Sequence, residues 1–179
     1  MLERLGELLP PPADPLEPGR PDGWPAVERS LGTALPGDFK AFTERYGSGT
    51  VDAFLYLFNP FTAGQDGNLL VEKDRVLAAY GQTRARFPDR LPLPAFPEPG
   101  GVLPVGRTEN GDELYWVTDG QPDGWPVVLV ASRAALQEVH PMSVTGFLAA
   151  LAANQLTSRV LPQDLLRRPG HRFTPFPAP

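Results

Sequence analysis

The sequence predicts an α+β fold: one domain with a mainly antiparallel (mixed), twisted sheet flanked by helices. Amphipathic helical patterns lie early in the chain, in its middle and near residue 150, whereas strand-like runs concentrate between residues 103 and 140. The short polar links between those runs, such as Asn110-Gly111, have the composition of hairpin turns. Helices that precede and follow a meander of strands are typical of the α+β class.

The composition is that of a folded protein. The chain has 179 residues, of which 41% are hydrophobic and 21% charged, so it is long enough for a sizeable core. It has no cysteine, which excludes disulfides, thiolate chemistry and cysteine-containing zinc sites. The first residues lack the apolar segment of a signal peptide, and no run approaches the roughly 20 apolar residues of a membrane span. We therefore expect a cytoplasmic protein without membrane association.

Four segments have the apolar spacing and the end signals of helices. They are residues 24–31, a segment from Pro36 or Gly37 to Tyr46, residues 68–86 and residues 144–153. Pro25 suits the first turn of a helix, Gly32 and Gly47 suit helix ends, and Ser143 suits an N-cap.

The strands are predicted from short runs rich in β-branched and aromatic residues. They are residues 51–58, 103–108, 113–118 and 126–131, with 136–140 as a further candidate. The proline-rich segment 87–101 cannot pair inside a sheet and is expected to be a surface connector.

Three regions are expected along the chain. Residues 1–23 form a proline-rich N-terminal arm that is weakly ordered, with one short helical stretch that ends at the prolines 10–12. Residues 24–155 form the globular domain. Residues 156–179 form an irregular basic C-terminal tail, in which Phe173 and Phe176 are candidate anchors.

The sequence Pro-Asp-Gly-Trp-Pro occurs twice, at residues 21–25 and 122–126. The first copy continues as a helix pattern and the second as a strand pattern, so this is not a duplicated domain. Pro-Asp-Gly favours a tight turn, after which the tryptophan points to the core and the second proline begins a new element.

Acidic residues gather in the stretch 108–132, which contains no lysine or arginine. These acids are Glu109, Asp112, Glu113, Asp119 and Asp123. The stretch is either a solvated hairpin surface or a surface that attracts a basic partner. Trp125, close behind it, is either a core residue or an exposed anchor of such a contact. The net charge of −5 argues against nucleic-acid binding, which requires a basic face.

No residues have the pattern of a catalytic, metal or cofactor site. His140 and His171 lie far apart and lack further ligands at metal-binding spacing. Asp112 is explained as a turn residue and its neighbour Glu113 as a solvent-facing one, so they do not predict acid–base catalysis. We therefore expect no enzymatic activity, no metal and no cofactor. An enzyme would need a pocket of titratable groups that the sequence does not reveal.

Short motifs follow one another in a fixed order from Trp24 to Ala153. They are Trp24 with Val27-Glu28, Leu31-Gly32-x-x-Leu35-Pro36-x-Asp38-Phe39, Tyr46-Gly47-x-Gly49, Leu103-Pro104-x-Gly106, Asn110-Gly111-Asp112-x-Leu114-x-Trp116, Trp125-Pro126-Val127-Val128 and Phe147-Leu148. This series resembles the SMI1/KNR4 family of the SUKH superfamily. The proline-rich connector and both ends of the chain lie outside the resemblance.

The resemblance implies an α+β domain with no catalytic residues. Bacterial members of the family are commonly immunity proteins that bind and neutralise a cognate toxin domain, often a nuclease or a deaminase, and fungal relatives are regulatory interaction proteins. A toxin is therefore the expected partner, and a regulatory interaction module without a toxin is the alternative. The shared positions are expected to be structural: Trp24, Glu28, Leu35, Pro36, Tyr46, Gly47, Gly111, Asp112 and Trp116. The partner surface is expected in the acid-rich stretch, at Glu109, Asp112, Glu113, Asp119, Asp123 and Trp125.

Overall fold

The computed structural model describes residues 1–177, which form six α-helices, a short 3-10 helix and seven strands. The helices are α1 (Leu2–Leu8), α2 (Trp24–Leu31), α3 (Gly37–Tyr46), α4 (Leu69–Arg86), α5 (Val144–Ala152) and α6 (Gln163–Leu166), with the 3-10 helix η1 (Pro122–Gly124). The strands are β1 (Gly49–Val51), β2 (Leu55–Leu57), β3 (Val102–Thr108), β4 (Glu113–Val117), β5 (Val127–Ala131), β6 (Leu136–His140) and β7 (Phe173–Pro175).

The strands form one open sheet in the order β6-β5-β4-β3-β2-β1-β7. Every neighbouring pair is antiparallel, so the α+β fold is confirmed and the sheet is wholly antiparallel instead of mixed. The chain runs as a meander from β1 to β6, and only β7 arrives from a distant part of the sequence. Because that last strand pairs with β1, the C-terminal segment supplies the edge strand on this side of the sheet.

The four predicted helices are confirmed as α2, α3, α4 and α5. Asn68 caps α4 by accepting a hydrogen bond from the Leu70 N–H at 3.0 Å. Ser143 caps α5 by accepting from the Gly146 N–H at 3.3 Å. Gly32 ends α2 at φ 77°, a conformation that glycine adopts without steric cost.

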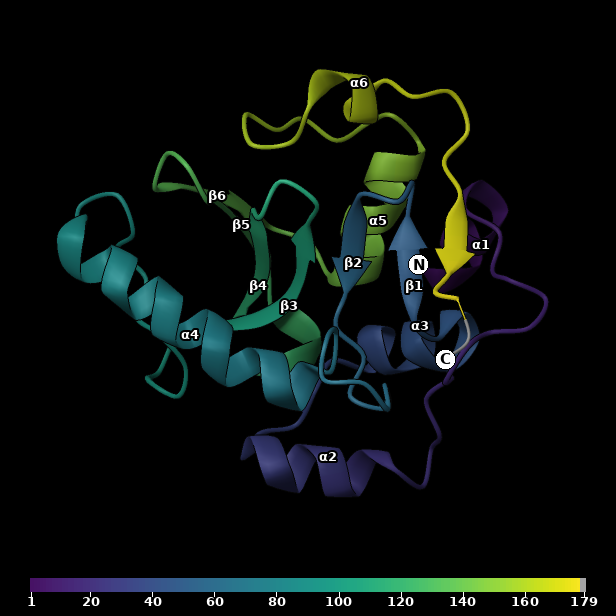
Figure 1. Ribbon diagram of the computed structural model, residues 1–179, viewed down its shortest axis with the longest axis horizontal. Helices are drawn as coiled ribbons and strands as arrows, with labels where there is room; N and C mark the ends of the chain where they lie inside the picture. The colour runs from purple at the N-terminus through teal and green to yellow at the C-terminus, as the bar shows by residue number, and fades with distance from the viewer. Residues whose placement is uncertain (178–179) are drawn as a thin grey trace.

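Different helices cover the two faces of the sheet. Trp116 of β4 meets Phe39 of α3 with ring centroids 4.9 Å apart, on the face where α1, α3 and α5 pack together. The adjacent Tyr115 points to the opposite face and meets Tyr80 of α4 at 5.4 Å. Figure 1 shows α4 crossing in front of β3, with β2, β1 and β7 beside it. The half of this face that is formed by β2, β1 and β7 is therefore not covered by α4.

The N-terminal arm is part of the hydrophobic core, unlike the weakly attached segment that the sequence predicts. Leu5 and Leu9 are both fully buried, and α1 packs against α5 and α3. The Tyr46 hydroxyl donates to the Leu9 carbonyl at 2.7 Å, and the Ser48 N–H donates to the Leu16 carbonyl at 2.7 Å. Proline interrupts the helix as expected, but the residues on both sides of it are fixed to the domain.

The C-terminal segment is also more regular than the irregular tail expected, since it contains α6 and β7. Thr174 of β7 lies opposite Thr50 of β1. Before this strand, Asp52 binds the segment through both its backbone and its side chain. Its N–H donates to the Arg172 carbonyl at 2.9 Å, and one carboxylate oxygen accepts the Arg172 N–H at 3.0 Å. The other oxygen lies 2.5 Å from Nδ1 of the buried His171.

The single strand predicted at residues 51–58 is wrong, because the chain reverses within it and forms the β1–β2 hairpin. Asp52 and Ala53 both have positive φ angles, 57° and 53°. Alanine rarely adopts this conformation, so the residues carry no local signal of a turn. The hydrogen bonds of Asp52 to the C-terminal segment help to hold the turn in place.

Both copies of Pro-Asp-Gly-Trp-Pro are entries to new elements, as predicted. The first precedes α2 and the second forms η1 before β5. Trp24 and Trp125 are each 4% exposed, so both tryptophans belong to the core. Trp24 contacts Phe61 with ring centroids 4.8 Å apart, and Trp125 contacts Trp116 at 6.2 Å.

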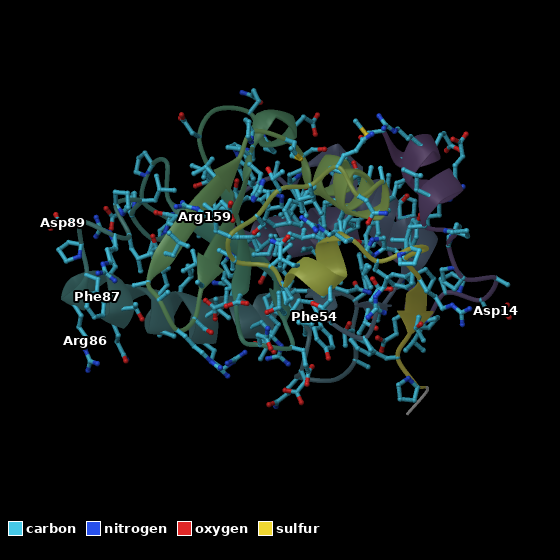
Figure 2. All side chains as sticks on the ribbon, turned by 90° about the horizontal axis from the view of Figure 1, so that it is seen from above. Asp14, Phe54, Arg86, Phe87, Asp89 and Arg159 are labelled. Carbon is cyan, nitrogen blue, oxygen red and sulfur yellow. The ribbon has the colours of Figure 1, made fainter. Side chains whose placement is uncertain are left out.

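The long axis of the molecule runs from the N-terminal arm to the end of α4. Figure 2 shows Asp14 at one extremity and Arg86, Phe87 and Asp89 at the other. Phe87 is 45% exposed there and lies under the Arg90 guanidinium, with 5.9 Å from its Cζ atom to the ring centroid.

Replacing Leu5 with alanine should lower the free energy of unfolding by about 2–5 kcal/mol, because the side chain leaves a cavity in the core. Val71→Ala, at a position 48% exposed on α4, should change it by less than about 0.5 kcal/mol. Urea denaturation followed by circular dichroism measures both variants. A Leu5→Ala protein as stable as the parent would show that the arm lies outside the cooperative core.

Candidate functional site

The residues predicted to form a partner surface do not lie together. They are Glu109, Asp112, Glu113, Asp119, Asp123 and Trp125. Glu109 and Asp112 lie in the turn from β3 to β4 and Glu113 is the first residue of β4, whereas the others lie in the connection from β4 to β5. The five residues of β4 separate the two groups by roughly 17 Å at about 3.4 Å per residue. The two ends of β4 are therefore separate regions.

Asp112 is a structural residue that joins two turns. Its side chain is buried and hydrogen-bonded to the Thr108 hydroxyl at 3.2 Å. The Ser132 N–H, in the turn from β5 to β6, donates to the same carboxylate at 3.0 Å. Gly111 precedes it at φ 83°, which glycine tolerates. The Asp112 side chain therefore presents little surface to a partner.

Glu113 faces the interior beneath α4, so the prediction that it is solvent-facing is wrong. It lies opposite Arg107 in the β3–β4 ladder and accepts a hydrogen bond from the Tyr115 hydroxyl. Burial raises the pKa of the Glu113 carboxyl above its ordinary 4.5, although the Tyr115 hydrogen bond and the charge of Arg75 act in the opposite direction. The same burial raises the pKa of Tyr115 well above 10.0, so Tyr115 stays a donor.

Trp125 is a core residue and not an exposed anchor. Its ring is 4% exposed and its Nε1–H donates to the Gly120 carbonyl at 3.3 Å. Asp119, before η1, and Asp123, within it, are exposed, and Asp123 accepts a hydrogen bond from the Gly37 N–H at 2.6 Å. Because Gly37 begins α3, the carboxylate of Asp123 is fixed at a helix N-terminus.

Three segments meet at this end of the sheet, which we call the acidic end: residues 95–101, 118–126 and 140–143. The Gly100 N–H donates to the Thr118 carbonyl and the Val127 N–H donates to the Met142 carbonyl, both at 3.1 Å. None of the three segments contains lysine or arginine. Their acids are Glu98, Asp119 and Asp123, all exposed and, among residues 1–177, without an ion-pair partner.

A shallow groove of about 360 Å³ runs beside these acids. Trp125, Pro126, Pro141 and Met142 contribute apolar atoms to its walls, and Asp123 lies on its rim. The acidic end therefore combines unpaired negative charge with an apolar depression.

The opposite end of β4 carries a different set of groups. Tyr56 of β2 and Arg107 of β3 are directly opposite each other in the ladder, and the Arg107 Cζ atom lies 6.0 Å from the Tyr56 ring centroid. Glu109 accepts a hydrogen bond from the Tyr56 hydroxyl, and this bond raises the pKa of Tyr56 above 10.0. Glu109 is exposed, but this side chain is already bound within the protein.

Glu72 of α4 lies next to this set and is 3% exposed. Its carboxylate accepts hydrogen bonds from Arg75 and from the Gly67 N–H, the latter at 3.2 Å. The Arg107 guanidinium lies 3.7 Å from Glu72 Oε1, outside hydrogen-bonding range. The buried charge of Glu72 is thus compensated, mainly by Arg75.

A cavity of about 510 Å³ opens on the half of the sheet that α4 leaves uncovered. Its floor is Tyr56, Leu57 and Phe58, and its walls are the loop 62–67 and the segment 16–17. Phe176, from the C-terminal segment, stacks on Tyr56 with ring centroids 6.0 Å apart and planes 19° apart. Four segments that are distant in the sequence build this cavity.

Tyr56 and Arg107 are functional candidates that no local pattern in the sequence indicates. Tyr56 belongs to an aromatic run that reads as core, and nothing local to Arg107 distinguishes it from other arginines. Only the pairing register of β2 with β3 brings the two side chains together. Phe176 was expected as an anchor of the tail, and it does pack on the sheet.

The two histidines have structural roles. Burial lowers the pKa of His140 below 6.5, although the nearby Glu138 opposes this, and its ring packs on Phe147 with centroids 5.1 Å apart. His171 is held by Asp52 as described above. Within residues 1–177, no three or more His, Asp or Glu side chains gather in a way that could hold a metal ion.

Two residues of the motif series, Glu28 and Gly47, fix contacts between neighbouring segments of the chain. Glu28 accepts the Leu35 N–H at 3.0 Å and Lys40 Nζ at 2.9 Å, which fixes the link between α2 and α3. Burial alone would raise the pKa of Glu28, but these two hydrogen bonds lower it below 4.5. Gly47 has a φ of 67°, and a Cβ there would lie 2.1 Å from the Leu16 carbonyl oxygen.

In comparisons with known proteins, the chain matches no family model, no curated protein and no solved structure. Membership of the SMI1/KNR4 family therefore stays a prediction that depends on the sequence motifs. Among the helices of residues 1–177, none has the length and apolar character needed to cross a membrane.

Asp112→Ala should lower the free energy of unfolding by about 1–3 kcal/mol, because it leaves the Thr108 hydroxyl and the Ser132 N–H without their acceptor. Asp119→Ala, the same change at an exposed position, should alter stability by no more than about 0.5 kcal/mol. Thermal or urea denaturation compares the pair. Equal stability of the two variants would refute a structural role for Asp112.

Glu113→Gln should remove a pH dependence of stability. A folded-state pKa above 4.5 means that the stabilising contribution of Glu113 is complete below that value and is lost as the pH rises through the folded pKa. Glutamine does not titrate and can still accept from Tyr115. The stability of Glu113→Gln relative to the parent should therefore increase with pH above about 4.5 and then level off. Urea denaturation at a series of pH values measures it, and a difference independent of pH contradicts the assignment.

Proposed function

We propose that this protein is a non-catalytic binding domain of the immunity type, which neutralises a basic toxin domain through its acidic end. The observation that carries the proposal is the meeting of Glu98, Asp119 and Asp123 beside the apolar groove at Trp125, with no ion-pair partner for any of the three acids among residues 1–177. The resemblance of the motif series to the SMI1/KNR4 family supports the choice of a toxin as the partner.

The charge of this surface suits a protein that handles nucleic acid. A nuclease or a nucleic-acid deaminase needs a basic face to hold phosphates, and an acidic inhibitor is attracted to that face over distances up to about a Debye length. Complementary charge raises the association rate, while apolar contacts in the groove lengthen the lifetime of the complex. Negative charge and an apolar depression on one surface therefore serve both stages of binding.

The acids of this surface differ in whether their side chains make hydrogen bonds or ion pairs within the protein. Asp123 is bound to the Gly37 N–H, so its charge is partly satisfied by the N-terminus of α3. Glu98 and Asp119 make no hydrogen bond or ion pair through their side chains within residues 1–177. These two acids can be replaced without removing an internal contact, which makes them suitable for testing the surface.

The double variant Glu98→Lys/Asp119→Lys should associate with the toxin encoded beside this gene roughly tenfold more slowly at low salt, because attraction is replaced by repulsion. The difference should shrink as the salt concentration rises. Asp14→Lys/Asp89→Lys makes the same change in net charge at exposed sites on the two ends of the long axis, and should have a much smaller effect (Figure 2). Stopped-flow or biolayer measurements give the rates.

Co-expression tests the biological role directly. The parent chain should protect cells from the neighbouring toxin, and the acidic-end variant should protect them less at limiting expression. Absence of a toxin gene beside this one, together with a stable complex with another cellular protein, would favour a regulatory interaction module instead. Protection that is unchanged in Glu98→Lys/Asp119→Lys would place the toxin on another surface.

A further inference from the structure

The cavity on the uncovered half of the sheet has the size and lining of a small-molecule site. Its volume of about 510 Å³ lies within the roughly 300–1,000 Å³ of ligand pockets. Leu16, Leu57, Phe58 and Ala63 give it apolar walls, and the stacked pair Tyr56 and Phe176 gives it an aromatic side. An apolar body with a flat face would bury most of its surface there.

Arg107 is the polar group of the cavity that has unused hydrogen-bonding capacity. Its side chain is 35% exposed and lines the cavity. Within residues 1–177, its guanidinium donates no hydrogen bond, and it forms one long ion pair, with Glu72 Oε1 at 3.7 Å. The guanidinium lies over the Tyr56 ring, 6.0 Å from its centroid, and this contact favours one orientation. A planar donor held in this way suits a carboxylate, which it can bind with two parallel hydrogen bonds.

The acids around the cavity already accept hydrogen bonds from other groups of the protein, so they do not favour a cation as the ligand. Both carboxylate oxygens of Glu17 accept hydrogen bonds, one from the Ala63 N–H at 2.7 Å and one from the Ser48 hydroxyl at 3.1 Å. Glu72 is bound by Arg75 and Gly67, and Glu109 by Tyr56.

Asp66 is the remaining acid of the lining, and it is exposed. The pKa of Arg75 is raised chiefly by its hydrogen bond to Glu72, and the charge of Asp66 makes a smaller contribution in the same direction, so Arg75 offsets part of the Asp66 charge. Arg107 is therefore the charged group that a ligand inside the cavity would meet without a competing hydrogen bond.

We propose that this cavity binds a small carboxylic acid with an apolar, preferably aromatic, body: the carboxylate pairs with Arg107, and the body packs on Tyr56 and Phe176. This function is independent of a partner at the acidic end, since the residues that line the cavity and those of the acidic end are different. Phe176 makes the C-terminal segment one wall of the site, so ligand binding and the seating of that segment are coupled.

Three probes with the same body but different charge test the proposal: 3-phenylpropionate, 3-phenylpropan-1-ol and 3-phenylpropylamine. Calorimetric titration of the full chain should give millimolar or tighter binding of the acid, as expected for a probe of this size. The alcohol should bind at least about tenfold more weakly, because it lacks the charge-assisted hydrogen bonds. Amide shifts in NMR spectra should change around Tyr56 and the loop 62–67.

Variants then separate the roles of charge and of the aromatic wall. Arg107→Gln should weaken binding of the acid by at least about tenfold and leave the alcohol unaffected. Phe176→Ala should weaken both probes, and Arg29→Gln, an exposed arginine on α2, should change neither. Thermal denaturation verifies that each variant is folded, and the alcohol titration gives a reading for Arg107→Gln that does not depend on the lost charge.

The proposal is overturned if no probe binds, or if the amine binds as tightly as the acid. It is also overturned if folded Arg107→Gln binds the acid as well as the parent does, or if the shifts map away from the cavity.

Discussion

The fold depends on how one long helix covers a sheet of seven strands. α4 packs across β3, and its Tyr80 reaches the Tyr115 ring of β4. The helix does not extend over β2, β1 and β7 (Figure 1). A sheet face that is not packed against another element leaves apolar side chains in water. Here the loop after β2, the N-terminal arm and the C-terminal segment take the place of a second helix, and the cavity is the space that they leave between them.

Both ends of the chain are fixed, but to different parts of the domain: α1 packs against α3 and α5, and β7 pairs with β1. The arm supplies Leu5 and Leu9 to the core and holds Ser48 at the entrance to β1. The C-terminal segment supplies β7 at the edge of the sheet, fastened by the contacts of His171 and Arg172 with Asp52. A short strand at an open edge is marginal on its own, so these contacts carry much of its stability. Each end covers part of the sheet that the central segments cannot reach.

The charges divide into two classes that serve different purposes. Asp112, Glu28 and Glu72 are turned inward and bound by named donors, so they join loops, turns and helices into one frame. In the described part of the chain, Glu98 and Asp119 make no side-chain hydrogen bond or ion pair, and they lie where segments without lysine or arginine meet. An acid-rich stretch of sequence therefore does not translate directly into an acidic surface, because strand geometry sends neighbouring acids to different places.

The sequence was sufficient for the elements whose signals are local. Periodicity and end signals such as Pro25, Gly32 and Ser143 predicted the helices, and Asn110-Gly111 predicted the β3–β4 turn. The β1–β2 hairpin could not be predicted in this way, since Asp52 and Ala53 hold positive φ angles because of contacts with a distant segment. The cavity could not be predicted from the sequence either, because the strand register that places Tyr56 opposite Arg107 is a tertiary property.

Hydrogen exchange of two backbone amides tests most directly whether the chain ends belong to the core. The Ser48 N–H is bound to Leu16 of the arm, and the Asp52 N–H is bound to Arg172 of the C-terminal segment. If the ends complete the sheet, both amides should exchange only by global unfolding, with the same opening free energy and denaturant dependence as the amides of β4. Exchange of Ser48 and Asp52 by local opening, faster than β4 and insensitive to denaturant, would show that the ends are detachable and would contradict the account.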